Sequence, residues 1–401
     1  MPEQTFLSFP VLFTFAVPHA IFTVLFLLSK EDSKIHDILA SIWIILLTLP
    51  IIQRFLLMQF EPFRIGIFFN SIVYPLTYGP MGYLYVKSLV EKNQNFSKYY
   101  LLHFLPILVF VIILSILPKS FHPNHPHHHP PIFLNSSDKP DFLLTAFIID
   151  GCNLISMFTY SILILQILKK HDNTVENYFS TITSRQNLNW MKWVIWIFII
   201  LFTWNSVSPA IFKFIFHNLE IKWVHPFEFK LIHSSIFIFF SYLLSFFTIR
   251  QSTIYQSKPF EVPQPKLDQT KEEKYIRSGL KEEDSKKIVN TLLDYMEKTK
   301  PYLKEDLRIR DIADELKINL NYLSQTLNEE IQKNFYQFVN EYRIKEVQKR
   351  LEDPKYKNYP LMRIALDCGF NSKSSFNSTF RRFTNISPTE YRKSILEKLE
   401  S

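Results

Sequence analysis

The chain has 401 residues, enough for two or three domains, with 47% hydrophobic residues, 20% charged residues and a formal net charge of +8. It contains only six glycines and no GxGxxG or Walker-type run, which argues against an enzyme that binds nucleotides. The two cysteines, Cys152 and Cys368, lie in different halves of the chain, so a disulfide framework and a CxxC metal site are both excluded.

Long apolar runs dominate the chain up to about residue 249. A membrane-spanning helix needs roughly 20 apolar residues, and these runs reach that length without the polar faces of a soluble bundle. We therefore expect seven spans, with six as the alternative because proline and glycine interrupt the third. The expected spans are Phe6–Leu28, Ile38–Leu57, Ile65–Val90, Tyr100–Leu117, Phe142–Leu168, Trp193–Phe216 and Leu231–Ile249.

An ionisable residue lies well inside the fifth expected span. Asp150 stands in FIIDGCNLISM, and Asn153 follows one turn later on nearly the same face. A carboxylate in hydrocarbon is energetically expensive, which marks Asp150 as a candidate functional residue. Lys213, in the sixth span, is expected at a similar depth and is the natural partner. These three residues therefore form either a signal-sensing pocket or a buried structural contact between helices.

The gap between the fourth and fifth expected spans, KSFHPNHPHHHPPIFLNSSDKP, is rich in histidine and proline. Imidazoles at this density can bind Zn, Cu or Ni. No cysteine or carboxylate completes a defined tetrahedral shell with these histidines, so a catalytic metal site is not expected. The open alternatives are a solvated low-complexity loop and a metal-binding loop formed by His122, His125, His127, His128 and His129.

A charged, proline-containing stretch, SKPFEVPQPKLDQTKEEKYIRSGLKEEDSKK, separates the apolar part of the chain from its more polar C-terminal part. This composition is typical of an extended, solvated tether. From Asp284 onward apolar residues recur at helical spacing, which predicts an amphipathic helix with Ile288, Leu292, Tyr295 and Met296 on one stripe.

The C-terminal part contains two copies of one pattern, RIRDIADELKINLNYLSQTLNEE and PLMRIALDCGFNSKSSFNSTFRRF. The Ile-Ala pair of the first copy, Ile312-Ala313, recurs 52 residues later, and the apolar residues after the turn recur with one residue inserted. Each copy predicts a short helix, a tight turn and a second helix, at about 307–328 and about 360–383. Gly369 can end the first helix in a left-handed conformation, whereas Lys317 occupies that place in the first copy with some strain.

The stretch between the copies, NFYQFVNEYRIKEVQKRLED, predicts one long amphipathic connecting helix. With the closing stretch SSFNSTFRRFTNISPTEYRK, the tandem motifs resemble the AraC/XylS-type DNA-binding domain over about Ser285 to Lys393. That family usually has glycine where this chain has Asn385, which also tolerates the left-handed conformation. The stretches YGPMGYLYVKSL and LLHFLP also look like the members of this family that carry a multi-spanning N-terminal sensor.

In such motifs the second helix enters the major groove and places outward side chains on base edges. Leu323, Leu327, Phe376 and Phe380 are expected to point inward. Asparagine and glutamine suit adenine edges, while lysine and arginine supply affinity for phosphates. The expected DNA-contacting residues are Asn321, Ser324, Gln325 and Asn328 in the first copy, and Ser372, Lys373, Ser374, Asn377, Arg381 and Arg382 in the second.

The expected fold class is therefore all-α, a polytopic transmembrane helix bundle followed by a tandem helix-turn-helix domain. We expect the sensor domain over residues 1–250, the linker over 251–284 and the AraC-type domain over 285–401. The DNA-binding domain must be cytoplasmic. The gaps that this orientation puts inside carry a small excess of lysine and arginine over those outside, as the positive-inside rule expects. Seven spans then put the protein in the inner membrane with its N-terminus outside.

The expected function is a membrane-embedded one-component transcription factor, without enzymatic activity or cofactor, that binds double-stranded promoter DNA. The bilayer-embedded part would sense an unknown small-molecule, lipid or metal signal, and homodimerisation is left open. The alternatives are a transporter and a metal-responsive membrane sensor, each with an appended regulatory tail. A transporter usually shows several intramembrane charges and a repeat between its halves, and neither is apparent in this sequence.

Overall fold

The computed structural model describes residues 3–31, 33–59, 74–90, 98–116, 140–181, 188–219, 226–255 and 282–400. Within these ranges the chain is helical, and the pairing of extended backbone is limited to an isolated antiparallel bridge between Phe179 and Arg308. The all-α fold class is therefore confirmed. The chain divides into two compact units, an N-terminal unit of Met1–Lys169 and Leu188–Pro259 and a C-terminal unit of Lys170–Asn187 and Phe260–Ser401.

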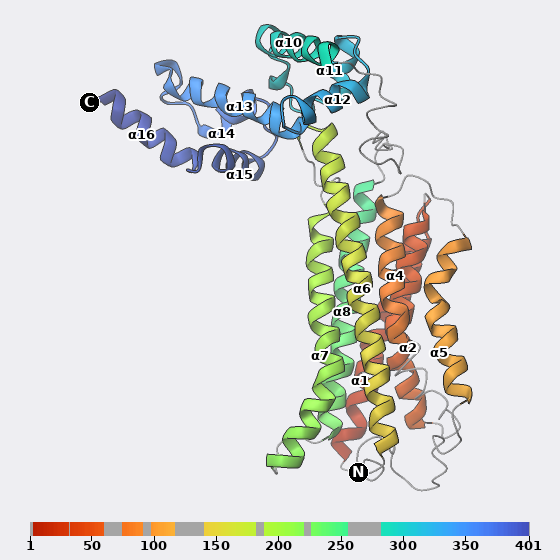
Figure 1. Ribbon diagram of the computed structural model, residues 1–401. Helices are drawn as coiled ribbons and strands as arrows, with labels where there is room; N and C mark the ends of the chain where they lie inside the picture. Colours follow the sequence, from red (N-terminus) through yellow and green to blue (C-terminus); the bar gives the residue numbers. More distant parts are fainter. Residues whose placement is uncertain are drawn as a thin grey trace. The chain divides into compact units, whose positions relative to one another are not determined.

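The N-terminal unit is built from long apolar helices that run alongside one another (Figure 1). A helix corresponds to each expected span, although the third is described only from Tyr74 and the fourth begins as a 3-10 helix over Lys98–Phe104. The helices are α1 (Glu3–Leu28), α2 (Ile35–Gln59), α4 (Tyr74–Val90), α5 (Leu105–Ile116), α6 (Pro140–Tyr178), α7 (Asn189–Leu219) and α8 (Pro226–Tyr255).

Aromatic side chains fill the middle of the N-terminal unit, around Trp43 of α2. The Trp43 ring is buried, and its centroid lies 6.1 Å from Tyr85 of α4, 6.4 Å from Phe198 of α7 and 6.1 Å from Phe240 of α8. Such tilted and edge-on ring pairs contribute beyond their buried area. One side chain of α2 therefore ties together three other helices.

Glycines in α4 let two neighbouring helices approach closely. A Cβ atom at Gly79 would lie 2.9 Å from Cδ2 of Tyr160 on α6, and one at Gly82 would lie 2.9 Å from Cη2 of Trp43. The Tyr160 hydroxyl lies 3.1 Å from Nδ1 of His103, so this tyrosine also carries a polar contact between segments. The expected interruption of the third span thus has a packing role.

Three helical segments of the described chain are long and apolar enough to cross a membrane, judged by length and composition. They are Ile35–Gln53, Asp150–Tyr178 and Asn189–Ser208. Three further apolar segments are shorter within the described ranges, namely Leu12–Leu28, Lys98–Val109 and Ser235–Arg250. The sequence predicted seven spans of full length, whereas three segments of the described residues meet this criterion of length and composition.

The C-terminal unit consists of short helices around two adjoining apolar clusters, and α13 contributes to both. The helix expected from Asp284 and the long connecting helix are confirmed, as α10 and α13. The helices are α10 (Glu282–Thr299), α11 (Ile309–Glu315), α12 (Leu320–Glu329), α13 (Phe335–Glu352), α14 (Leu361–Asp367), α15 (Lys373–Thr384) and α16 (Pro388–Glu400).

Helix α6 ends later than the sequence predicted. The expected span stops at Leu168, but the helix continues to Tyr178 through the polar stretch KKHDNTVENY. Val175, Tyr178 and Phe179 are buried in the first apolar cluster of the C-terminal unit. The extension is stabilised by that burial, which a window of local hydrophobicity does not register.

We expect Gly79→Ala to lower the free energy of unfolding of the full-length chain by about 1–3 kcal/mol, because the added methyl group overlaps the Tyr160 side chain. Thermal unfolding of the purified protein measures this. The matched control is Gly151→Ala on α6, where an added Cβ has no heavy atom within 4 Å among the described neighbours. Alanine favours helix at that site, so its midpoint should stay the same or rise. Equal midpoints for both variants would contradict the close approach.

Candidate nucleic-acid interface

The first helix-turn-helix motif consists of α11 and α12. Ala313 of α11 is buried against α12, whose Leu323 and Leu327 point inward as expected. Lys317 in the turn has φ 57°, which confirms the left-handed backbone predicted there. The Asn319 side chain caps α12 by accepting a hydrogen bond from the backbone N–H of Asn321 at 2.9 Å. The left-handed backbone at Lys317 and the Asn319 cap therefore fix where α12 begins.

The second motif, α14 and α15, repeats this design. Gly369 has φ 89°, as expected, and Phe376 and Phe380 of α15 point inward. Ser372 caps α15 by accepting a hydrogen bond from the Ser375 N–H at 3.2 Å. Asn385 ends the helix with φ 62°, the left-handed conformation predicted for it.

Most of the expected DNA-contacting residues lie on the outer faces of α12 and α15. Asn321 and Asn328 are exposed on α12, whereas Ser324 and Gln325 are half-buried. The Gln325 amide donates to Glu329 Oε2 at 2.9 Å, which orients it along the helix surface. On α15 the exposed residues are Lys373, Ser374, Asn377, Arg381 and Arg382, and Ser372 is half-buried as the cap.

The proposed sensing and metal residues are described only in part. Asn153 is buried and Asp150 half-buried on α6, but the Lys213 side chain lies outside the described residues, so their pairing stays a prediction. The five loop histidines, His122, His125, His127, His128 and His129, also lie outside them. In the ranges that the structure covers, no group of three or more His, Cys, Asp or Glu side chains could hold a metal ion.

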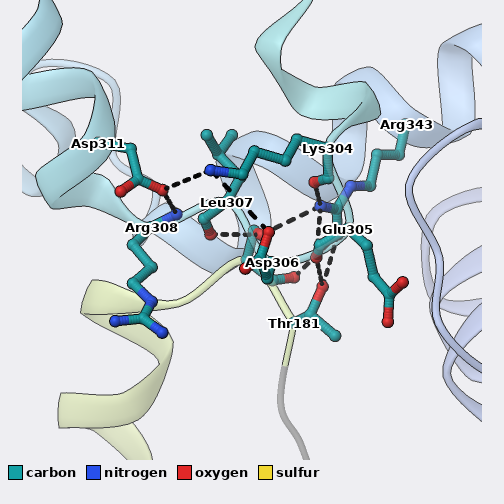
Figure 2. Close-up of polar contacts among 9 residues, drawn as sticks. Thr181, Lys304, Glu305, Asp306, Leu307, Arg308, Asp311 and Arg343 are labelled. Atoms are coloured by element: carbon teal, nitrogen blue, oxygen red, sulfur yellow. Dashed lines mark hydrogen bonds and ion pairs between the residues drawn. The ribbon is translucent and has the colours of Figure 1, made fainter.

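Arg343 of α13 holds the framework of both motifs together, although its side chain is 0% exposed. Its guanidinium donates six hydrogen bonds to described residues, among them Nε to Tyr302 O at 2.8 Å and Nη2 to Lys304 O at 2.7 Å. Figure 2 shows Arg343 and Thr181 converging on the backbone around Glu305. Burial lowers the pKa of Arg343 to about 10, so the group stays charged at neutral pH.

Arg343 is not among the residues predicted from the sequence, because arginine is almost never fully buried unless it is paired. A signal was nevertheless present. Asn340, Arg343 and Val347 are spaced three and four residues apart, so they lie on one stripe of α13. All three are buried, and a polar pair on an otherwise apolar stripe marks a position with specific partners.

The turn of the second motif packs directly on this arginine. A Cβ atom at Gly369 would lie 2.5 Å from Tyr302 O and 2.9 Å from Arg343 Nε. The neighbouring Cys368 is buried, and burial raises the pKa of its thiol to about 12, so it is an inert core residue. Glycine is therefore required here for space as well as for backbone conformation.

We expect Gly369→Ala to destabilise the C-terminal unit by at least about 1–2 kcal/mol, the cost of a left-handed alanine, with the overlap on Tyr302 O adding to it. Lys317→Gly, at the equivalent turn, should stabilise it by up to about 1 kcal/mol. Hydrogen exchange of the α13 and α15 amides in the full-length chain measures both changes. Unchanged exchange in Gly369→Ala would show that the turn tolerates a side chain.

Residues 312–394 match a family model described as a helix-turn-helix domain, of the AraC type. The chain is 36% identical to the melibiose operon regulatory protein of Escherichia coli (strain K12) over 87 residues, which are 22% of this chain and 28% of that protein. It is 32% identical to an uncharacterized HTH-type transcriptional regulator of Staphylococcus aureus (strain COL) over 104 residues, 26% of this chain and 13% of the relative.

The chain thus spans less than a third of the length of these relatives, and the similarity covers a limited C-terminal part of it. No solved structure gives a significant match. The family match encloses the second half of the first motif's opening helix, all of α12 to α15 and the start of α16. Residues 312–394 are therefore an AraC-type helix-turn-helix domain.

Proposed function

We propose that the protein is a membrane-embedded one-component transcription factor. Its C-terminal unit binds double-stranded promoter DNA in the cytoplasm, and its N-terminal unit spans the inner membrane and senses a signal. The observation that carries the DNA-binding part is the pair of N-capped helices, α12 and α15. Each is held from behind by buried apolar side chains and presents polar side chains to solvent.

The exposed face of α15 has the chemistry of a major-groove reader. Asn377 and Arg381 are four residues apart, so they share one face of the helix. Asparagine pairs with adenine and arginine with guanine through bidentate hydrogen bonds, and each good pair is worth about 1–3 kcal/mol of discrimination. Arg382, on the adjacent face, suits a phosphate.

Helix α12 differs in that the residues expected to contact DNA on it carry no positive charge. Asn321 and Asn328 favour adenine edges and supply no charge for phosphates. The connecting helix α13 has 18 residues and thus a length of about 27 Å. Two motifs joined by a rigid connector of that length suit successive major grooves, which lie about 34 Å apart on one side of the duplex. We therefore assign affinity mainly to α15 and additional base reading to α12.

The membrane part of the proposal is supported by the outward surface of the N-terminal unit. Phe22 of α1, Trp193 and Ile200 of α7 are each more than 60% exposed. Large apolar side chains pointing away from a core already filled by Trp43 and its neighbours are costly in water and favourable in lipid. A cytoplasmic DNA-binding unit and seven spans place the N-terminus outside.

Fusions at residue 401 test this topology. A fluorescent protein that matures in the cytoplasm should be bright there, and alkaline phosphatase, which is active outside, should be inactive, because DNA is cytoplasmic. The same reporters placed in the gap between residues 118 and 139, expected outside, should give the opposite pattern. Phosphatase activity at residue 401 would exclude promoter binding by the membrane-bound chain.

DNA binding is tested with the full-length protein in lipid nanodiscs and duplexes selected from a random pool. Asn377→Ala should weaken binding by about 1–3 kcal/mol and relax the preference at one base position. Arg382→Ala should weaken all sequences alike and reduce the salt slope by about one. Lys298→Ala on α10, where Lys298 pairs with Asp294 at 2.8 Å, is the charge-matched control and should have little effect. Selection of no duplex at low salt would reject the function.

A further inference from the structure

A segment far from the helix-turn-helix domain in sequence is part of its core. We call residues 170–181 the α6 tail; it comprises the last turns of α6 and the three residues after them. Val175, Tyr178 and Phe179 are buried with Leu292 and Met296 of α10 in the first apolar cluster. More than a hundred residues separate the two segments in sequence, yet both belong to this cluster.

The end of the α6 tail pairs with the backbone that leads into the first motif. Phe179 and Arg308 form the antiparallel bridge, and the Ser180 N–H donates to Leu307 O at 3.2 Å. The Ser180 hydroxyl donates to the same carbonyl at 2.6 Å, and the Thr181 hydroxyl donates to Glu305 O at 2.7 Å. The segment before α11 is therefore held by the α6 tail through side chain and main chain alike (Figure 2).

The α6 tail also supplies half of the six acceptors of Arg343. Nη1 donates to Ser180 O at 3.2 Å and to Thr181 Oγ1 at 2.9 Å, and Nη2 donates to Ser180 Oγ at 3.1 Å. Both described acceptors of Nη1 thus belong to the α6 tail. A buried guanidinium that loses its hydrogen-bond partners is strongly destabilising. Without the α6 tail the Arg343 side chain must therefore move toward solvent, or water must reach it in its present position.

A movement of Arg343 reaches both motifs. Its Nε lies 2.9 Å from where a Gly369 side chain would begin, so the turn of the second motif has no free space beside it. A second path runs through Asn340, which donates to Ser180 O and to Tyr336 O, both at 2.8 Å. The Tyr336 hydroxyl is hydrogen-bonded to Thr379 of α15 at 3.0 Å. The α6 tail is thus linked to the DNA-facing helix by continuous contacts.

Helix α6 is uninterrupted from Pro140 to Tyr178, and residues up to Lys169 belong to the N-terminal unit. We infer that the α6 tail is the regulatory contact of the protein: docked, it orders Arg343 and the DNA-reading arrangement, and displacement of α6 undocks it and lowers DNA affinity. This inference rests on the proposed function, since it assigns how the N-terminal unit would act on DNA binding.

The first test breaks the contact in the full-length protein in nanodiscs. Ser180→Ala with Thr181→Val removes two of the three acceptors that the α6 tail gives Arg343. Affinity for the selected duplex should fall at least about tenfold, and exchange of the 302–308 amides should rise. Thr174→Val is the matched control, because the Thr174 hydroxyl bonds back to Lys170 O within the helix, and it should bind like the wild type.

A covalent clamp keeps the test decisive if that variant folds poorly. The Asn334 amide donates to Glu176 Oε2 at 2.8 Å, so Glu176→Cys with Asn334→Cys, in a Cys152→Ser background, places two thiols across the docked α6 tail that a short bifunctional thiol reagent can join. Cross-linking should restore the affinity that Ser180→Ala with Thr181→Val removes, relative to the same variant left unlinked. Cross-linking without restored affinity would overturn the inference.

The second test separates transmission from simple support of the fold. One alanine inserted between Lys169 and Lys170 rotates the following helix by about 100° and shifts it by ~1.5 Å, leaving every α6-tail residue intact. Affinity should fall at least about tenfold. A flexible Gly-Ser insertion at the same place interrupts the helix, so the rotation is not passed on to the α6 tail. This variant should keep wild-type affinity. Equal affinity for the two insertions would show that α6 transmits nothing.

The two proposals fail in different ways. If the wild-type protein selects no duplex at low salt, the DNA-binding function is wrong and the inference falls with it. If the wild type binds and both the broken contact and the alanine insertion leave its affinity unchanged, the function stands and the regulatory role of the α6 tail is rejected.

Discussion

A charged guanidinium without access to water constrains the whole C-terminal unit. The Arg343 side chain leaves solvent only because carbonyl and hydroxyl oxygens from separate parts of the chain surround it. The six acceptors in the described chain are all neutral, so their number and placement must balance the lost hydration. Each segment that contributes an oxygen is therefore fixed relative to α13, and a shift of one changes the fit of the others.

That constraint explains how short helices present a stable surface. Helices α11 and α14 have seven residues each, too few to persist alone in water. Their positions come from burial of Ile312 and Ile364 against their partner helices, from the side-chain caps of α12 and α15, and from the arginine beneath the second turn. Rigid support from behind leaves the outward side chains free to meet a ligand, which in the proposed function is DNA.

The N-terminal unit, by contrast, is held together mainly by apolar packing. Its interior is aromatic, with glycines in α4 admitting the rings of Tyr160 and Trp43, and many of its described outward side chains are large and apolar as well. Helices that are hydrophobic on all sides gain little from water, and their association relies on close packing of small and large residues. In the proposed function the two units therefore meet different surroundings, and among the described helices α6 contributes residues to both.

The sequence alone determined the apolar helices, the duplicated motif, the left-handed turns at Lys317, Gly369 and Asn385, and the inward residues of α12 and α15. All of these depend on local spacing and backbone preference, which a linear pattern records. Periodicity also placed most of the expected base-contacting positions on exposed surface, whereas Ser324 and Gln325 are half-buried and Ser372 uses its oxygen as a cap.

The burial of Arg343 and the extension of α6 past Leu168 were decided by the tertiary structure. So was the assignment of residues 170–181 to the C-terminal unit rather than to an N-terminal domain ending at residue 250. These features depend on contacts between segments more than a hundred residues apart, such as Thr181 with Arg343. A polar side chain gives no local sign of whether distant oxygens will replace its water; only the folded chain brings them together.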